Sequence, residues 1–257
     1  MSAAGSPGVV RDLGQTAMFT WRVFRAAIRP RPLRLLPRQL VKYAHEIGAR
    51  SVLLVSVVCA FAGAMLAVQG FATLHMLGAP ELLGMFIGLG GVREVFPLVA
   101  AGTVGARAGC AIAAEIATLQ IGEQIDALEV MSVDPVAYLV APRLLAAVLV
   151  TPLVMAVGVL AGLGAAYLTA VVQLGVDPGA YLARAYGPLS YHDSVGIIVK
   201  GLVFGVIVVV VTSIEGFRAR GGAAGVGVAA NRAVVRAMVA GSVVNLALSQ
   251  LLFGGME

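Results

Sequence analysis

Charged side chains are scarce in this chain of 257 residues, and their scarcity excludes an ordinary water-soluble domain. Only 12% of the residues are charged and 60% are hydrophobic, whereas soluble domains contain about 25% charged residues. Uncharged runs at 51–74, 144–176 and 237–256 can each cross a bilayer, which takes roughly 20 apolar residues as a helix. Two more apolar segments, 82–106 and 195–214, contain internal charges. The composition predicts an all-α polytopic membrane protein with five transmembrane helices.

Cysteine and histidine are too few and too scattered to suggest a metal centre or a disulfide framework. Cys59 and Cys110 lie far apart, in or beside apolar segments, where a free cysteine usually acts as a small buried hydrophobic residue. The three histidines, His45, His75 and His192, fall in three separate regions. We therefore expect no metal site, and no serine or histidine motif predicts a catalytic nucleophile.

Lysine is rarer still, and its positions exclude a nucleotide-binding P-loop. That loop needs a Gly-Lys-Ser/Thr sequence after a glycine-rich turn. The only lysines, Lys42 and Lys200, both follow valine, and the glycine-rich stretch RGGAAGVG (220–227) contains no lysine. We expect that this chain binds no cofactor and cannot hydrolyse ATP by itself.

The cations that are present favour one side of the membrane. The net charge of +5 could suggest nucleic acid, but half of the 18 Lys and Arg residues lie before residue 51, as in cytoplasmic flanks of membrane helices. With the N-terminus inside, the inner segments hold fifteen Lys or Arg and the outer segments one, Arg184. The inner segments are 1–50, 107–143 and 215–236, and the outer ones are 75–81, 177–194 and the last residue. We predict a cytoplasmic N-terminus, an extracytoplasmic C-terminus and no nucleic-acid partner.

Two kinds of segment accompany the spans. Within residues 1–50, aromatic or leucine residues alternate with cations, which is typical of helices that lie in the headgroup layer; a flank that only sets topology is the alternative for residues 1–20. Small-residue pairs spaced as GxxxG allow close helix packing in lipid. They occur at 84–88, 105–109, 158–162 and 201–205.

An acidic stretch, IGEQIDALEVMSVDP (121–135), stands out in this apolar chain. At 100° per residue, Glu123, Asp126 and Glu129 share one side of a helix. The opposite side gathers Ile121, Ile125, Leu128 and Met131. Asp134 precedes Pro135, which disfavours further helix. We predict a short amphipathic helix over 121–131 that presents acids to a basic cytosolic partner, although a solvated connector is also compatible with the pattern.

Three ionisable residues lie inside the predicted spans: Arg93 and Glu94 in the second and Lys200 in the fourth. Such residues are costly in the bilayer and usually face a wet cavity or a partner. We hypothesise that Glu94 and Lys200 approach each other across a cavity, with Arg93 available to a phosphate or carboxylate headgroup. The alternative is a structural ion-pair network. Nearer the inner membrane face, Arg107 and Glu115 could pair with each other.

A longer pattern resembles one family. The segment GARAGCAIAAEIATLQIGEQIDALEVMSVDPVAYLVAPR (105–143) is similar to the signature of the MlaE/YrbE permeases, the membrane subunits of Mce-associated lipid ABC transporters. REVFP (93–97), VKGLVFG (199–205) and GFRARGGAAGVG (216–227) resemble other parts of that family, in the same order. Phe96, Ala106, Cys110 and Leu119 depart from the family pattern. The resemblance covers roughly residues 40–253.

The resemblance implies a single permease domain over 1–257, with a transmembrane bundle at 51–256, in a bacterial inner membrane. It implies that 121–131 is a coupling helix, with Glu123, Gln124, Asp126 and Glu129 contacting a cytosolic ABC ATPase. Arg93, Glu94 and Lys200 would line a lipid cavity. The implied partners are the ATPase, a second permease subunit, Mce-domain proteins at the outer loop, and membrane lipids. An ion- or proton-coupled carrier that uses the same three charges, or a lipid-handling membrane enzyme, is the alternative.

Overall fold

The computed structural model describes residues 6–28 and 36–254, and throughout these ranges the chain is helical apart from short turns, with no strand. Five helical segments are long and apolar enough to cross a membrane. They are Arg38–Met76, Pro80–Ile121, Val136–Gln173, Tyr191–Phe217 and Gly222–Phe253. The prediction of an all-α polytopic membrane protein with five crossings is therefore confirmed.

Most spans contain several helical elements that follow one another without a break; those labelled η are π-helical, except η2, which is a 3₁₀-helix. The first comprises α2 (Leu36–Ala44), η1 (His45–Ala49) and α3 (Arg50–Met76). The second comprises η2 (Pro80–Leu82), α4 (Leu83–Phe86), η3 (Ile87–Val95), α5 (Phe96–Val104), η4 (Gly105–Gly109) and α6 (Cys110–Ile121). The third comprises η5 (Val136–Val140), α8 (Ala141–Leu168) and η6 (Thr169–Gln173). The fourth is α10 (Tyr191–Phe217) and the fifth is α11 (Gly222–Phe253), while α1 (Ser6–Ile28), α7 (Gln124–Val130) and α9 (Pro178–Tyr186) lie outside the spans.

The second span is longer than the 82–106 segment predicted for it. Arg107 and Glu115 interrupt the apolar run but do not break a helix, so the chain stays helical to Ile121. Its 42 residues make a rod of about 63 Å at 1.5 Å per residue. Because a bilayer with its headgroups is about 40–45 Å thick, this helix is long enough to project beyond the membrane. The fifth span likewise begins at Gly222 instead of 237; its predicted last residues, 255 and 256, lie outside the described part of the chain, as does Glu257.

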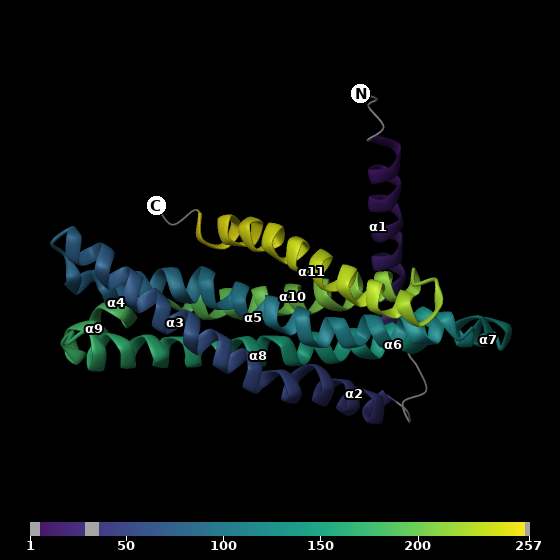
Figure 1. Cartoon of the computed structure of the whole chain (residues 1–257), viewed down its shortest axis with the longest axis horizontal. Coiled ribbons are helices and arrows are strands. Elements are labelled where there is room, and N and C mark those ends of the chain that lie inside the picture. Colours follow the sequence, from purple (N-terminus) through teal and green to yellow (C-terminus); the bar gives the residue numbers. More distant parts are fainter. Residues whose placement is uncertain (1–5, 29–35, 255–257) are drawn as a thin grey trace.

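The elements sort to two ends of an elongated bundle (Figure 1). At one end, which we call the α7 end, lie α7, the start of α2 and the turn between α10 and α11. At the other, the α9 end, lie α9 and the turn from α3 to α4. The helix α1 runs across the long axis of the bundle, beside the α7 end (Figure 1). This direction is compatible with the predicted interfacial position of α1, whereas residues 1–5 and 29–35 of the N-terminal segment lie outside the described residues.

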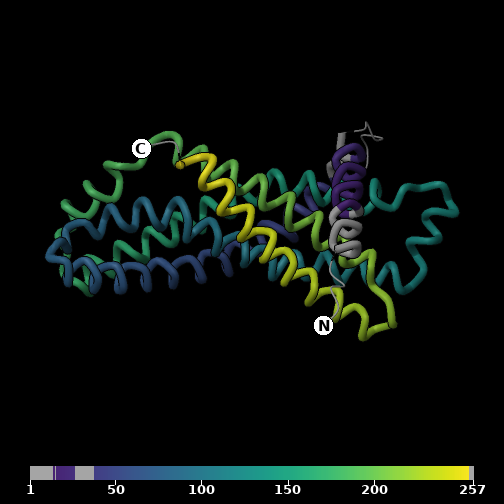
Figure 2. The backbone as a smooth tube through the Cα atoms, turned by 90° about the horizontal axis from the view of Figure 1, so that it is seen from above, coloured from purple at the N-terminus to yellow at the C-terminus, as the bar shows by residue number. Residues whose placement is uncertain are grey.

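Helix α8 forms the centre of the packing, with α3 and α10 against it, whereas α11 crosses the bundle obliquely (Figure 2). Close approach depends on glycine at several crossings. A Cβ on Gly63 of α3 would lie 2.1 Å from the main-chain oxygen of Gly162 in α8. Likewise, a Cβ on Gly84 or Gly88 would meet main-chain oxygens of α9 at 2.4 and 2.3 Å. Small residues at these positions let helix backbones touch, as expected in a membrane.

Candidate functional site: a polar cluster above an apolar cavity

Six polar residues from three spans meet within the bundle, and we call them the polar cluster. Arg93 and Glu94 come from η3, Asp193 and Lys200 from α10, and Asn245 and Ser249 from α11. Asp193 and Lys200 are seven residues apart, so two helical turns place them on the same face of α10. The cluster contains two cationic and two anionic side chains, which gives a formal net charge of zero.

Lys200 is the centre of this cluster and is almost completely buried, with 1% of its surface exposed. Its Nζ lies 2.5 Å from the main-chain oxygen of Arg93 and 2.7 Å from Ser249 Oγ. Residue 97, which would donate to the carbonyl of Arg93 in an α-helix, is Pro97 and has no N–H. Lys200 donates to this carbonyl from a neighbouring span.

Lys200 also contacts Glu94, as hypothesised from the sequence. The Nζ to Oε1 distance is 3.5 Å, and Asn245 Nδ2 donates to the other carboxylate oxygen of Glu94 at 2.9 Å. The Glu94 side chain is 42% exposed, so one side of this ion pair faces the outside of the bundle. The contact establishes the pairing and leaves its role in a lipid cavity as a prediction.

Arg93 is not available in the way we expected. Its Nε donates to Asp193 Oδ1 at 2.6 Å and its Nη2 to Oδ2 at 3.4 Å. Asp193 also accepts from the main chain and hydroxyl of Ser190, in a capping box at the start of α10. The expectation of an unpaired Arg93 was wrong because α10 begins at Tyr191, before the predicted start of the fourth span, and so brings Asp193 from the predicted outer loop into the cluster.

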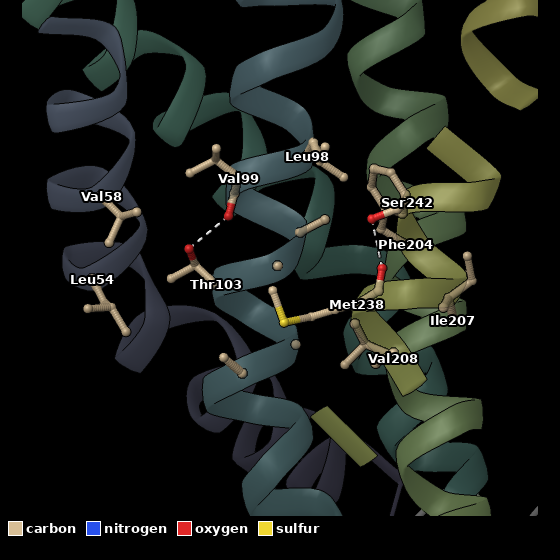
Figure 3. A pocket seen from close by; sticks show the side chains of 16 residues that line it. Leu54, Val58, Leu98, Val99, Thr103, Phe204, Ile207, Val208, Met238 and Ser242 are labelled. Carbon is tan, nitrogen blue, oxygen red and sulfur yellow. Dashed lines mark hydrogen bonds between the residues drawn. The ribbon is translucent and has the colours of Figure 1, made fainter. Parts of the chain in front are cut away.

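An apolar cavity of about 490 Å³ lies next to the cluster. Figure 3 shows its side chains: Leu54 and Val58 come from α3, Val99 and Thr103 from α5, Phe204 and Val208 from α10, and Met238 and Ser242 from α11. The Thr103 and Ser242 hydroxyls donate to main-chain oxygens of their own helices (Figure 3). Their hydrogen-bonding capacity as donors is thus used, and the wall that remains is almost entirely hydrocarbon.

The cluster and the cavity follow the same helices. Leu98 and Gly102 line the cavity one and two turns after Glu94, and Phe204 lines it one turn after Lys200. On α11, Ser242 and Met238 line the cavity about one and two turns before Asn245. The cavity therefore extends from the polar cluster toward the α7 end. None of Arg93, Glu94 and Lys200 lines the cavity itself; they lie at its α9-facing side.

The acidic segment forms a shorter helix than predicted. Instead of one helix over 121–131, α6 ends at Ile121 and α7 begins at Gln124. Glu123 between them has φ 56°, in the left-handed region, which costs a non-glycine residue about 1–2 kcal/mol. Gly122 and Glu123 thus turn the chain sharply, and amphipathic periodicity alone could not reveal this turn.

The predicted contact residues Glu123, Gln124, Asp126 and Glu129 are all exposed at the α7 end. On the other side of α7, Ile125 is buried and Leu128 packs against the core. Met131, which the sequence pattern placed on the apolar side of the helix, is 63% exposed, and Val130 is 86% exposed. The helix therefore presents acids and two bare apolar side chains together.

Arg107 and Glu115 do not pair with each other. Arg107 donates to the main-chain oxygen of Glu46 and to Ser51 Oγ, at 3.3 and 3.4 Å. Glu115 instead pairs with Arg143, which is fully buried, at 2.7 Å. The two residues are eight positions apart, and each meets the chain that packs against its own turn of the helix.

Four residues in or beside the polar cluster were not predicted as site residues: Asp193, Asn245, Ser249 and Phe253, whose ring lies 4.8 Å from the Arg93 guanidinium carbon. Asn245 and Ser249 stood in an uncharged run and carried no distinguishing signal. Ser190 and Asp193 do form a Ser-x-x-Asp pattern, which is a helix-start signal related to the capping box. This pattern places the start of the fourth span at 191, where α10 begins, and not at the predicted 195.

Known proteins match most of this chain. The family model described as Permease MlaE matches residues 40–251. The chain belongs to the MlaE permease family. A probable ABC transporter permease protein of Rickettsia typhi is 34% identical over 245 residues, 95% of this chain and 93% of its own. The MlaE protein of Haemophilus influenzae, an intermembrane phospholipid transport system permease, is 31% identical over 84% of this chain and 83% of its own.

A chloroplast protein is similar too. The Arabidopsis thaliana protein TRIGALACTOSYLDIACYLGLYCEROL 1 is 29% identical over 85% of this permease and 62% of its own length. The matched region of the family model contains nearly all of the five spans, all six residues of the polar cluster, and α7. This chain is thus a multi-pass ABC transporter permease, and the polar cluster, the cavity and α7 are the features of this permease that a function has to explain.

Proposed function

We propose that this permease is the membrane subunit of an ABC transporter that moves phospholipid between the membrane and an extracytoplasmic Mce-protein assembly. The main support for this proposal is that a charged cluster is followed by a hydrocarbon-lined cavity along the same three helices. A phospholipid has the same succession of a charged headgroup and apolar chains. The relative from Haemophilus influenzae is named as a phospholipid transport permease, which supports this choice of cargo.

In this proposal the cluster receives the headgroup and the cavity receives part of an acyl chain. Glu94 and Arg93 are the accessible members of the cluster, with 42% and 22% of their side chains exposed. Burial of apolar chain surface in the cavity contributes about 25 cal/mol per Å². A headgroup phosphate would have to draw Arg93 from Asp193, so loading and release are expected to depend on that ion pair.

The energy for transport would come from a separate cytosolic ATPase that binds α7. Exposed acids on α7 suit a basic groove on the ATPase, and the exposed Val130 and Met131 offer apolar contact area beside these acids. Because α6 and α7 continue the second span, a displacement of α7 would move the helix that carries Arg93, Glu94 and one wall of the cavity. We further propose that two permease subunits, identical or paralogous, form the working dimer.

The orientation follows from the same proposal. With the α7 end in the cytoplasm of a bacterial cell, the described start of the chain lies inside, and the end of α11 lies outside near α9. The loop that contains α9 would then meet the Mce partner. The separation of these elements into two ends (Figure 1) is compatible with this topology.

Purification of the permease from its own membranes tests the proposal. We expect a cytosolic ATPase to copurify, two permease copies in each complex, and phospholipid in the organic extract. Proteoliposomes that contain the complete complex should transfer phospholipid only with ATP. A permease that purifies alone and conducts ions or protons from proteoliposomes would support the carrier alternative and contradict the proposal.

A further inference from the structure

A second, polar pocket lies at the opposite end of the second span from the polar cluster. Its volume is about 240 Å³, and its wall includes Glu46 and Arg50 from the first span and Arg107 and Glu115 from the second. Two π-helical segments, η1 and η4, supply Glu46 and Arg107 to it. Single π-helical turns inside α-helices are frequent at functional sites. We call this cavity the interfacial pocket.

The depth of the pocket places it in a headgroup layer. Arg107 follows Pro80, the start of the second span, by 27 residues, or about 40 Å of helix. Arg50 precedes Met76, the end of the first span, by a similar length of helix. Since a bilayer with headgroups measures about 40–45 Å, both arginines fall in the headgroup layer at the α7 end. The pocket is separated from Glu94 by about 20 Å along the helix.

The charges of the pocket are unequally compensated. Both carboxylates have cationic neighbours: Glu115 pairs with Arg143 at 2.7 Å, and Glu46 lies 3.9 Å from Lys42. Neither guanidinium has a carboxylate partner within the described part of the chain: Arg107 donates to two uncharged oxygens, and Arg50 forms no ion pair there. The pocket therefore combines two positive charges with no anion of their own and an opening beside the lipid headgroups.

We propose that the interfacial pocket binds the phosphate of a membrane phospholipid, held by Arg50 and Arg107. Guanidinium groups bind phosphate through charge-assisted, often bidentate hydrogen bonds. A headgroup in this position would tie the start of α3 to the helix that continues into α7. This site is distinct from the proposed transport cavity, and phospholipid would bind to it even if the permease did not transport lipid.

Site-specific photocrosslinking tests the proposal in the full-length chain. A benzophenone amino acid at Ala111, an exposed residue of the pocket wall, is irradiated in phosphatidylglycerol vesicles that carry a ³²P-labelled headgroup. We expect labelled phospholipid on the chain, and about tenfold less label with Arg50→Gln, as for the loss of one charge-assisted contact. Arg50 is exposed, so this variant should fold. Arg184→Gln, the same charge change on exposed Arg184 of α9, should keep the label.

Two further arms complete the test. The same benzophenone residue at Val130, on α7, should capture little lipid. Excess inorganic phosphate in the buffer should not reduce the label at Ala111, because the free ion lacks the apolar anchor of the lipid. Equal labelling with Arg50→Gln and the unmodified arginine would overturn the proposal. Displacement by inorganic phosphate would show a small-anion site and would also overturn it. If the complete complex shows no ATP-driven phospholipid transport while the label at Ala111 persists, the result counts against the proposed function only.

Discussion

Lys200 donates to the main-chain oxygen of Arg93, at 2.5 Å, across the boundary between the fourth and second spans. The acceptor is a carbonyl that Pro97 leaves without its α-helical donor. The buried ammonium group of Lys200 has three partners: the Arg93 carbonyl, the Glu94 carboxylate and the Ser249 hydroxyl. The same side chain therefore fixes the backbone of the second span and sets the position of Glu94.

This relationship predicts that Lys200 and Pro97 are energetically coupled. Lys200→Met removes the Nζ donor from the Arg93 carbonyl and the cation from Glu94 Oε1, so that Glu94 is left with Asn245, and should lower the free energy of unfolding by about 3 kcal/mol. In a Pro97→Ala background the new N–H can reach that carbonyl, so the loss should be about 1 kcal/mol smaller. Thermal unfolding of the four proteins in detergent measures the coupling. An identical loss in both backgrounds would show that Pro97 does not create the need for Lys200.

A second prediction concerns the crossing of α3 and α8. Gly63→Ala would place a methyl group 2.1 Å from the main-chain oxygen of Gly162, so the helices must move apart and stability should fall by about 2 kcal/mol or more. The control is Gly164→Ala, on α8 but with no atom within 4 Å of the new Cβ. Alanine should there raise stability by up to about 1 kcal/mol. If both variants melt alike, close packing at Gly63 is not what holds the two helices together.

Tyr181 of α9 yields a prediction outside the spans. Its ring is buried, its hydroxyl has no hydrogen-bond partner among the described residues, and burial raises the pKa of the phenol to about 12. Tyr181→Phe removes an unsatisfied buried group and should stabilise the protein by about 1 kcal/mol. Burial raises the pKa of this phenol in the folded state above its unfolded value. The stability linked to keeping the phenol protonated is therefore fully present below pH 10 and is lost as the pH rises from about 10 to 12.

The pH dependence of unfolding separates the two effects. The unmodified protein should lose more stability than Tyr181→Phe between pH 10 and 12, measured by thermal melts of the two proteins in the same detergent. Parallel pH profiles would mean that burial does not raise the pKa of this phenol, and a lower melting temperature for the phenylalanine variant at pH 7 would mean that the hydroxyl has a partner that stabilises it.

The exposed acids of α7 yield a fourth prediction. Asp126→Lys should weaken copurification of the ATPase about tenfold, because it reverses a charge that a basic groove would face. Glu81→Lys is the matched control, since Glu81 is exposed at the opposite end of the second span. Quantitative pull-down with the ATPase as the readout compares them. Equal recovery of the ATPase with both variants would argue against α7 as its docking element.

Periodicity and composition predicted the five spans and α7 correctly in kind but misplaced their ends. Hydropathy reports where the chain is apolar, whereas a helix ends where its backbone is interrupted, as at Gly122 and Glu123. The charges Arg107 and Glu115 therefore stopped the predicted second span fifteen residues too early, without stopping the helix itself.

The pairing of Glu94 with Lys200 could be predicted because both are isolated charges at similar depths in apolar spans. The partner of Arg93 could not be, since it required knowing that α10 starts at Tyr191 and carries Asp193. Asn245 and Ser249 could not be predicted from the sequence, for another reason. Neutral polar residues are common in membrane helices, and only the packing of α11 against α10 and the second span brings these two to Lys200 and Glu94.

If lipid enters the cavity beside the polar cluster during transport, as proposed, filling that cavity should block transport. Gly102 lines the cavity, and a Cβ added there would have only Met238 within 4 Å, at 3.7 Å, so Gly102→Phe would occupy the space with its ring. The control, Gly164→Phe, adds the same ring where nothing lies within 4 Å of the Cβ position. ATP-dependent phospholipid transfer from proteoliposomes should fall at least about tenfold with Gly102→Phe, while the ATPase still copurifies and the control transfers normally. Transfer at the unmodified rate with the cavity filled would show that lipid does not use this cavity.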